Sequence, residues 1–275
     1  MTKFDIELVG KVGSMALINK EWGDINYNVI SKISRQLRPG YAWVTSGAAE
    51  IGRLDFIKRN GVELTGNVQD VKTDYAAQGQ SILMASYREY IDPKYSVRQF
   101  LIENQNFNDP VRKEYLKSIL LRCPKQNAIP IINYNDPLSN DEIVKLELNK
   151  LRDKGQKVVH CADNDETASQ VACLLKCKNL LIYTSTLGIY RVPNDESTLI
   201  KEICAANSYE LIESINETQK LCEGASRLGA NGAKAKLEYI KAPVENGTTV
   251  YIASPKYRID DILNDKAPST KIYIK

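Results

Sequence analysis

The chain alternates between short, continuous apolar runs and longer stretches in which apolar residues recur every three or four positions. Continuous runs rich in Val, Ile and Leu are typical of strands buried on both faces, and the longer period is typical of amphipathic helices. We expect strands at 4–9, 42–45, 129–133, 158–161, 180–184 and 250–253. We expect helices at 27–37, 76–90, 111–122, 141–154, 165–176 and 233–241.

This alternation of strands and helices predicts an α/β fold, with a mainly parallel central sheet covered by helices on both faces. The length of 275 residues allows one large domain or two lobes. The charged helix predicted at 141–154 ends at Asp153-Lys154-Gly155 before a new apolar run, so we place a lobe boundary near residue 155. In open α/β sheets, ligands bind beyond the carboxyl ends of the strands, and the residues that follow each strand are therefore the candidates for function.

Composition narrows the class of protein. The net charge is only +3, from 37 basic and 34 acidic residues spread along the chain, and the basic block typical of nucleic-acid binders is missing. The sequence has no run of the roughly 18 apolar residues that a membrane helix needs, and its start lacks a signal core. We expect a cytoplasmic protein that binds neither nucleic acid nor membrane. Six cysteines and one histidine show no metal-ligand spacing, so we expect no metal site built from side chains.

Two segments in the first half follow predicted strands and suit anions. In Gly10-Lys11-Val12-Gly13-Ser14, a lysine between glycines can reach a phosphate that the backbone N–H groups also approach. Thr45-Ser46-Gly47 leads into a helix, whose exposed amides suit a carboxylate or a phosphate. The alternative interpretation of residues 10–14 is a tight turn with a solvated lysine, and that of residues 45–47 is an ordinary N-cap at Ser46.

Asn and Asp side chains follow the next two predicted strands. The first cluster is 133–136, Asn-Tyr-Asn-Asp, and the second is 163–165, Asp-Asn-Asp. Because the strands would be neighbours, we expect both clusters to converge in one crevice, where they offer partners for a zwitterionic substrate and a carboxylate to orient lysines. An N-cap explains one Asp of the second cluster, but it does not explain the pairing of the two clusters.

The second half contains two candidate nucleotide segments. The strand predicted at 180–184 is followed by a turn that contains Gly188. The glycine-rich loop 224–232 leads into a helix with lysines in its first turn, which is typical of a phosphate site. Gly224 and Gly229 have P-loop spacing, but Ala230 stands where that motif has lysine, so we do not expect a P-loop ATPase. A flexible surface loop is the alternative interpretation.

Together and in this order, these segments resemble glutamate 5-kinase, within the amino-acid kinase superfamily, along nearly the whole chain. Residues 10–14 resemble its Lys-x-Gly-[Ser/Thr] loop, 45–48 its [Ser/Thr]-Ser-Gly-Ala segment, and 76–80 its Ala-Ala-x-Gly-Gln helix. Residues 129–136 are similar to its Ile-Pro-x-Ile-Asn-Glu-Asn-Asp, with Tyr in place of Glu, and 163–165 reproduce its Asp-Asn-Asp.

The resemblance implies a three-layer αβα sandwich that forms one amino-acid kinase domain over 1–275, with an acceptor-substrate lobe at 1–155 and a nucleotide lobe at 156–275. It implies ATP and Mg²⁺ as cofactors, a homo-oligomer (dimer or tetramer), and phosphorylation of the glutamate side-chain carboxylate to an acyl phosphate for proline biosynthesis. The implied catalytic residues are Lys11, Asp165 and Lys236. The implied substrate-binding residues are Ser46, Gly47, Asn135, Asp136, Asp163 and Asn164. The implied nucleotide-binding residues are Gly13, Ser14, Thr184, Ser185, Gly229, Ala230, Asn231 and Gly232.

The chain also departs from the family pattern. Ser185 stands where the family has Asp, and the loop 229–236 has lost one glycine, the threonines and the methionine of the family motif. The sequence ends at residue 275, so we expect no RNA-binding-type C-terminal domain of the kind that many glutamate 5-kinases carry. Two alternatives stay open: a different acceptor (another amino acid, carbamate or a small phosphate), or a regulatory protein that binds nucleotide or amino acid with weakened catalysis.

Overall fold

The computed structural model describes residues 4–139, 141–155, 158–161, 163–222 and 232–275. Its strands are β1 (Ile6–Val12), β2 (Ile18–Asn19), β3 (Asp24–Ile25), β4 (Tyr41–Val44), β5 (Ser96–Ile102), β6 (Ala128–Tyr134), β7 (Cys177–Tyr183), β8 (Glu202–Ala205), β9 (Thr249–Ala253) and β10 (Ser269–Ile274). Its helices are α1 (Ser14–Leu17), α2 (Tyr27–Ser34), α3 (Ala48–Asn60), α4 (Val68–Tyr90), α5 (Gln105–Asn108), α6 (Pro110–Lys125), η1 (Asp136–Leu138), α7 (Asp141–Asp153), α8 (Asn164–Leu174), η2 (Glu196–Thr198), α9 (Ser208–Leu221), α10 (Ala233–Tyr239), α11 (Lys241–Glu245) and α12 (Ile259–Leu263).

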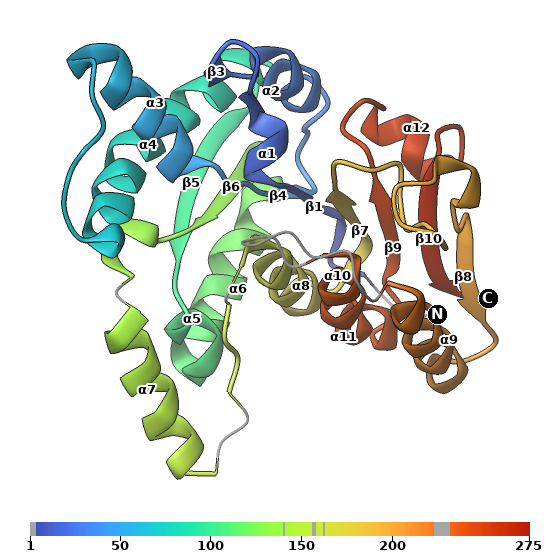
Figure 1. Ribbon diagram of the computed structural model, residues 1–275. Helices are drawn as coiled ribbons and strands as arrows, with labels where there is room; N and C mark the ends of the chain where they lie inside the picture. The colour runs from blue at the N-terminus through green and yellow to red at the C-terminus, as the bar shows by residue number, and fades with distance from the viewer. Residues whose placement is uncertain (1–3, 140, 156–157, 162, 223–231) are drawn as a thin grey trace.

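One continuous sheet runs through the molecule, with the strand order β5-β6-β4-β1-β7-β9-β10-β8 (Figure 1). The strands from β5 to β9 in this order pair in parallel, and β10 is antiparallel to β9. The central pair, β1 and β7, joins the two halves of the chain, because all strands on one side of it precede residue 135 and all on the other side follow residue 176. The predicted mainly parallel sheet is confirmed.

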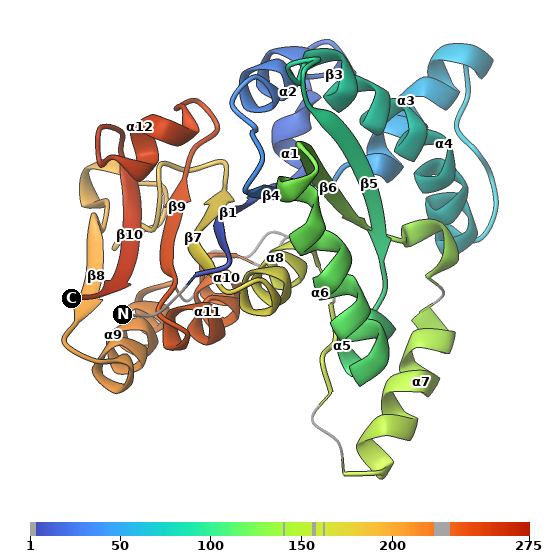
Figure 2. The ribbon, with the colours of Figure 1, turned by 180° about the vertical axis from the view of Figure 1, so that it is seen from behind.

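Helices cover both faces of this sheet, as the view from behind also shows (Figure 2). Alternate residues of β4 face opposite layers: Trp43 packs into the core under α2, α3 and α4, and Val44 packs into the core under α6 and α8. In β7, Leu181 and Ile182 divide between the two cores in the same way. Period-two alternation of fully apolar residues is what a sheet buried on both faces requires. The α/β three-layer sandwich is therefore confirmed.

Several helices begin where a side chain caps them. Asn26 accepts a hydrogen bond from the N–H of Val29 at the start of α2, and Asp109 accepts one from Arg112 at the start of α6, where Pro110 is the first helical residue. Such caps satisfy backbone donors that have no partner within the helix. Within the described residues, no helix is both long and apolar enough to cross a membrane.

The prediction of a strand at 158–161 is wrong. These residues form no strand, because two asparagine side chains supply the hydrogen bonds that a neighbouring strand would give. Asn108 accepts from the N–H of Val159 and donates to its carbonyl, at 2.8 and 2.7 Å, and Asn104 accepts from the N–H of Cys161 at 2.7 Å. The second Asp/Asn cluster therefore follows an irregular segment and opens helix α8, rather than following a strand of the sheet.

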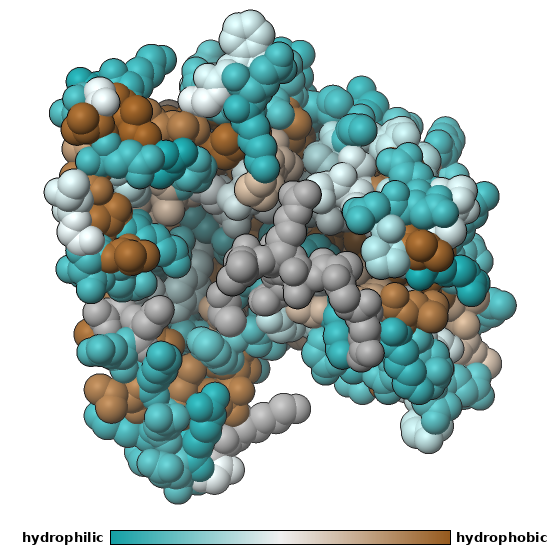
Figure 3. All heavy atoms as spheres, viewed as in Figure 1, coloured by the Kyte–Doolittle hydropathy of each residue, from teal (hydrophilic) through white to brown (hydrophobic). Residues whose placement is uncertain are grey.

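Two boundaries also differ from expectation. Strand β1 extends to Val12, so Lys11 lies within the strand instead of after it. Helix α8 ends at Leu174, since Lys176 adopts a left-handed φ of 43° and β7 begins at Cys177. Helix α7 projects from the body in both ribbon views (Figures 1 and 2). Hydrophobic patches appear in this region of the space-filling view, where Leu138, Ile143 and Leu146 are exposed (Figure 3).

Candidate active site

Two lysines from opposite ends of the chain hold one buried carboxylate between them. Lys11 Nζ lies 2.6 Å from Asp165 Oδ1, and Lys236 Nζ lies 2.9 Å from Asp165 Oδ2. The Asp165 side chain is 5% exposed, and those of Lys11 and Lys236 are 9% and 15% exposed. Strand β1, helix α8 and helix α10 thus meet at one charged centre, and the three residues implied as catalytic are brought together.

Local sequence explains where the carboxylate of Asp165 lies and why there is room beside Lys11. Asp163 caps α8 by accepting from the N–H groups of Asp165 and Glu166, at 2.7 and 3.0 Å, which places Asp165 in the first turn. A carboxylate in the first turn also interacts favourably with the helix dipole. A Cβ added to Gly13 would lie 3.4 Å from Lys11 Nζ, so this glycine leaves room beside the ammonium group.

Asp165 carries its charge in spite of its burial. Burial raises the pKa of this carboxyl, but the charges and hydrogen bonds of Lys11 and Lys236 outweigh that effect and lower the pKa below its ordinary value of 3.8. Opposite charges close to an acid favour its ionised form. The centre therefore holds an anion between two cations at neutral pH.

The segment 45–48, which the resemblance implies binds the acid substrate, adjoins this centre. Asn164, which precedes Asp165, donates from Nδ2 to Ser46 Oγ at 2.6 Å, and so α8 is tied to the turn between β4 and α3. Gly47 adopts a left-handed φ of 98° at the N-terminus of α3, which no side chain caps. A Cβ on Gly47 would lie 3.6 Å from the Cα of Ser14, so the segments 10–14 and 45–48 lie against each other.

Asn135 and Asp136, two of the implied substrate-binding residues, directly follow β6. Asn135 Nδ2 donates to Glu103 Oε1 at 2.6 Å, and Asp136 Oδ1 lies 4.0 Å from Lys72 Nζ on helix α4. Burial raises the pKa of Asp136, and the charge of Lys72 acts in the opposite direction. Strands β4 and β6 are neighbours, with Val44 in register with Ile132, so Asp136 and Ser46 both follow strand ends at the same edge of the sheet.

The implied nucleotide residues are only partly within the described structure. The N–H of Thr184 donates to the carbonyl of Ala253 at 2.8 Å, which places Thr184 and the exposed Ser185 at the end of β7. Gly232 is the residue before α10, and its carbonyl accepts from the N–H of Lys236 at 3.3 Å. Gly229, Ala230 and Asn231 lie outside the described residues. The part of these residues in nucleotide binding stays a prediction.

Two further side chains belong to this region. Asn133 is part of the predicted cluster 133–136, and Gln80 is not among the residues implied to bind a ligand. The N–H of Tyr134 donates to Asn133 Oδ1 at 2.9 Å, so the amide group of Asn133 must donate, and its Nδ2 lies 2.8 Å from Gln80 Oε1. Gln80 Nε2 is consequently a buried donor for which the described residues provide no acceptor. The only signal for Gln80 was its place in the helix motif at 76–80.

Tyr134, which stands where the family has Glu, has a structural role that its sequence position did not reveal. Its hydroxyl accepts hydrogen bonds from Asn104 Nδ2 at 2.8 Å and from Ser139 Oγ at 2.9 Å. Asn104 is the same side chain that accepts from the N–H of Cys161. Tyr134 thereby joins β6 to the segment that leads into α8. In the part of the chain that the structure describes, no three His, Cys, Asp or Glu side chains form a group that could hold a metal ion.

Comparison with curated proteins finds relatives that are named glutamate 5-kinase. Residues of this chain are 31% identical over 260 positions to a glutamate 5-kinase of Streptococcus suis, a match that covers 90% of this chain and 64% of that protein. They are 30% identical over 201 positions to a glutamate 5-kinase of Shouchella clausii, covering 71% of this chain and 48% of that protein. The chain thus spans between about half and two thirds of the length of these two relatives.

Comparison with solved structures supports the fold. Carbamate kinase from Giardia lamblia, bound to AMP-PNP, superimposes with a TM-score of 0.60 over 100% of both chains at 18% sequence identity. The sequence pattern of the "Amino acid kinase family" matches residues 8–254, which include all three members of the charged centre. This chain belongs to the amino acid kinase family.

Proposed function

We propose that this chain is an ATP-dependent kinase that phosphorylates the side-chain carboxylate of glutamate to an acyl phosphate, the type of reaction used in proline biosynthesis. The observation that carries the proposal is the pairing of Asp165 with both Lys11 and Lys236. The glutamate 5-kinase name of its relatives supports the choice of acceptor. The structure of a carbamate kinase supports the fold only.

The charged centre suits phosphoryl transfer, which needs positioning and charge neutralisation more than covalent help from the protein. In the proposed reaction, an oxygen of the acceptor carboxylate attacks the γ-phosphorus of ATP, and the bond from that phosphorus to the bridging oxygen breaks to release ADP. No proton changes place, so a general base is not required. Lys11 and Lys236 would stabilise the charge on the transferred group from two sides, while Asp165 holds both lysines in position.

The remaining predicted residues divide between the two substrates. Residues 1–155 would form the acceptor lobe, together with the start of α8, and residues 156–275 the nucleotide lobe. The acceptor would contact Ser46, Gly47, Asn135, Asp136, Asp163 and Asn164. The nucleotide would contact Gly13, Ser14, Thr184, Ser185 and the segment 229–232.

The charge of the candidate site is compatible with bound ATP and Mg²⁺. The buried ammonium group of Lys11, the partly buried one of Lys236 and the glycine beside Lys11 provide cationic space for phosphates. The described residues provide no cluster of acids for a metal. Mg²⁺ would therefore be held mainly by the phosphates and by water, which is its usual preference. When bound, it would neutralise charge on the transferred phosphate.

The test is ADP release from ATP and Mg²⁺ across a panel of acceptors: L-glutamate, L-aspartate, other amino acids, carbamate and small phosphates. We expect turnover with L-glutamate, and none with a Lys236→Met control that is purified in parallel. Turnover on another acceptor alone would overturn the choice of glutamate and retain the kinase. Binding of ATP without turnover on any acceptor would favour a regulatory protein.

A further inference from the structure

Helix α4 runs antiparallel to the segment 133–139 and contacts it at three successive levels. Gln69 Nε2 donates to the carbonyl of Ser139 at 3.0 Å, Lys72 lies 4.0 Å from Asp136, and Gln80 accepts from Asn133. The first half of α4 is therefore one wall of the acceptor end of the site. None of these α4 residues is among the substrate-binding residues implied by the family resemblance.

Lys72 and Asp136 present opposite charges on this wall. The carboxylate of Asp136 is 27% exposed, and none of the described residues donates a hydrogen bond to it. Its distance of 4.0 Å from Lys72 Nζ is too long for a hydrogen bond. A partly buried carboxylate without a donor is costly, and a cationic ligand would relieve that cost. Lys72 is 56% exposed, so its ammonium group is also accessible to a ligand.

The charge pair matches the head group of an α-amino acid. In that head group an ammonium and a carboxylate are separated by a single carbon atom, so the two charges lie close together with opposite signs. A head group laid against the pair of Lys72 and Asp136 would satisfy both protein charges at once. Neither carbamate nor inorganic phosphate carries an ammonium group for Asp136.

We propose that Lys72 and Asp136 read the zwitterionic head group of the acceptor, with Asp136 binding its α-ammonium and Lys72 binding its α-carboxylate. This inference rests on the proposed function and assigns Lys72 as a specificity-determining residue. The side-chain carboxylate of the acceptor would then extend toward Lys11 and Asp165, where phosphoryl transfer takes place.

The experiment compares L-glutamate with its α-amide, L-isoglutamine, which has the same side-chain carboxylate and α-ammonium but an uncharged amide in place of the α-carboxylate. We expect the wild type to prefer L-glutamate by about 10- to 100-fold in kcat/KM, the size of a hydrogen bond between charged groups. Lys72→Met should lose most of this preference, because the substitution lowers kcat/KM for L-glutamate and leaves kcat/KM for L-isoglutamine nearly unchanged. Lys72→Arg should retain most of the preference. Any change at Asp136 caused by removing the lysine affects both substrates and cancels in their ratio.

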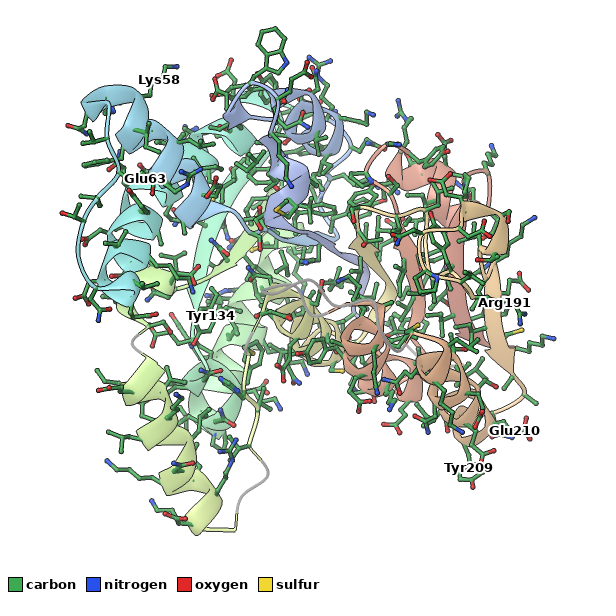
Figure 4. The ribbon with its side chains drawn as sticks, viewed as in Figure 1. Lys58, Glu63, Tyr134, Arg191, Tyr209 and Glu210 are labelled. Atoms are coloured by element: carbon green, nitrogen blue, oxygen red, sulfur yellow. The ribbon has the colours of Figure 1, made fainter. Side chains whose placement is uncertain are left out.

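The matched control is Lys58→Met, because Lys58 is an exposed lysine at the far end of α3, distant from Tyr134 at the end of β6 (Figure 4). Thermal melting of each variant shows whether it is folded. If Lys72→Met lowers kcat/KM equally for both substrates, or leaves the preference of the wild type unchanged, the inference is overturned and the kinase proposal stands. If the wild type fails to phosphorylate L-glutamate, both proposals fall together.

Discussion

Asp165 is the residue on which the candidate site depends most, because it is the shared partner of two lysines from distant parts of the chain. Because Asp165 is buried, water cannot compensate the charge of Lys11 or Lys236 if the carboxylate is removed. Removing one member of a buried ion pair costs about 3–5 kcal/mol, since the remaining charge is left without compensation. The stability of the fold and the arrangement of the site are therefore linked at this one side chain.

Asp165→Asn should lower the free energy of unfolding by about 3–5 kcal/mol at neutral pH. The folded-state pKa of Asp165 lies below its ordinary value of 3.8, so its stabilising effect is complete above that value and is lost as the pH falls through the folded-state pKa. The difference between wild type and variant should be constant between about pH 5 and 8 and shrink below about pH 4. Urea unfolding across this range measures it, and a difference that grows on acidification would contradict the assignment.

Tyr134→Phe tests the second buried polar connection. Loss of the hydroxyl leaves Asn104 Nδ2 without its acceptor, and Asn104 is only 3% exposed, so we expect a loss of about 1–3 kcal/mol of stability. Tyr209→Phe is the control, because Tyr209 is 72% exposed on α9 and lies far from this region (Figure 4). Chemical denaturation of both variants gives the comparison, and equal effects would mean that the contacts of Tyr134 contribute nothing specific.

Residue motifs predicted the charged centre of the candidate site, but they did not predict the buried polar contacts around it. The Asp-Asn-Asp motif and the two lysines indicated the charged centre, since charge and glycine spacing are visible in the letters. Asn104, Asn108 and Gln80 could not be predicted, because their partners are distant in sequence and their residue types are common in ordinary loops and helices. The contact of Lys72 with Asp136 could not be predicted for the same reason.

At the level of elements, helices α3 and α4 cross in direct backbone contact. A Cβ added to Gly79 would lie 1.9 Å from the carbonyl oxygen of Ala48, and one added to Gly52 would lie 1.8 Å from that of Tyr75. These two glycines therefore set how closely α4 approaches the first turn of α3. That turn directly follows Ser46 and Gly47, so the crossing positions the segment that we propose binds the acceptor.

Gly79→Ala should force the two helices apart. We expect a loss of about 1–3 kcal/mol in stability, typical of overpacking, and a higher KM for the acceptor with little change in the KM for ATP. Ser81→Ala is the control on the exposed face of the same helix and should change stability by less than about 0.5 kcal/mol. Thermal melts and initial rates measure both effects, and a Gly79→Ala variant as stable as Ser81→Ala would refute the close crossing.

For the whole molecule, the pattern of apolar runs predicted the fold class and five of the sheet strands, because buried parallel strands are continuous in their hydrophobicity. It missed β5, β8 and β10, which are only partly buried and in which apolar and polar residues are mixed. The pattern also predicted a strand at 158–161, where side-chain amides supply the hydrogen bonds that a neighbouring strand would make. Pattern alone could not show that β1 pairs with β7 across the middle of the chain.

This central pairing predicts that the two halves unfold together. Both tryptophans, Trp22 and Trp43, lie in the first half, so their fluorescence reports that half, while far-ultraviolet circular dichroism reports the whole chain. We expect the two probes to give one coincident transition in urea, since separation of the halves would expose the edges of β1 and β7. Two separate midpoints would show that the halves are independent.

The shared carboxylate of Asp165 has a consequence for how this chain can evolve. Under the proposed function, a lineage that no longer needed phosphoryl transfer would be expected to lose Lys11 and Lys236 by drift. Each loss alone, however, would unbalance a buried charge and weaken the fold. Mutation would have to replace all three side chains, through intermediates that are less stable than either end point. Under the proposed function, natural selection for a folded protein and selection for an active enzyme therefore preserve the same three residues.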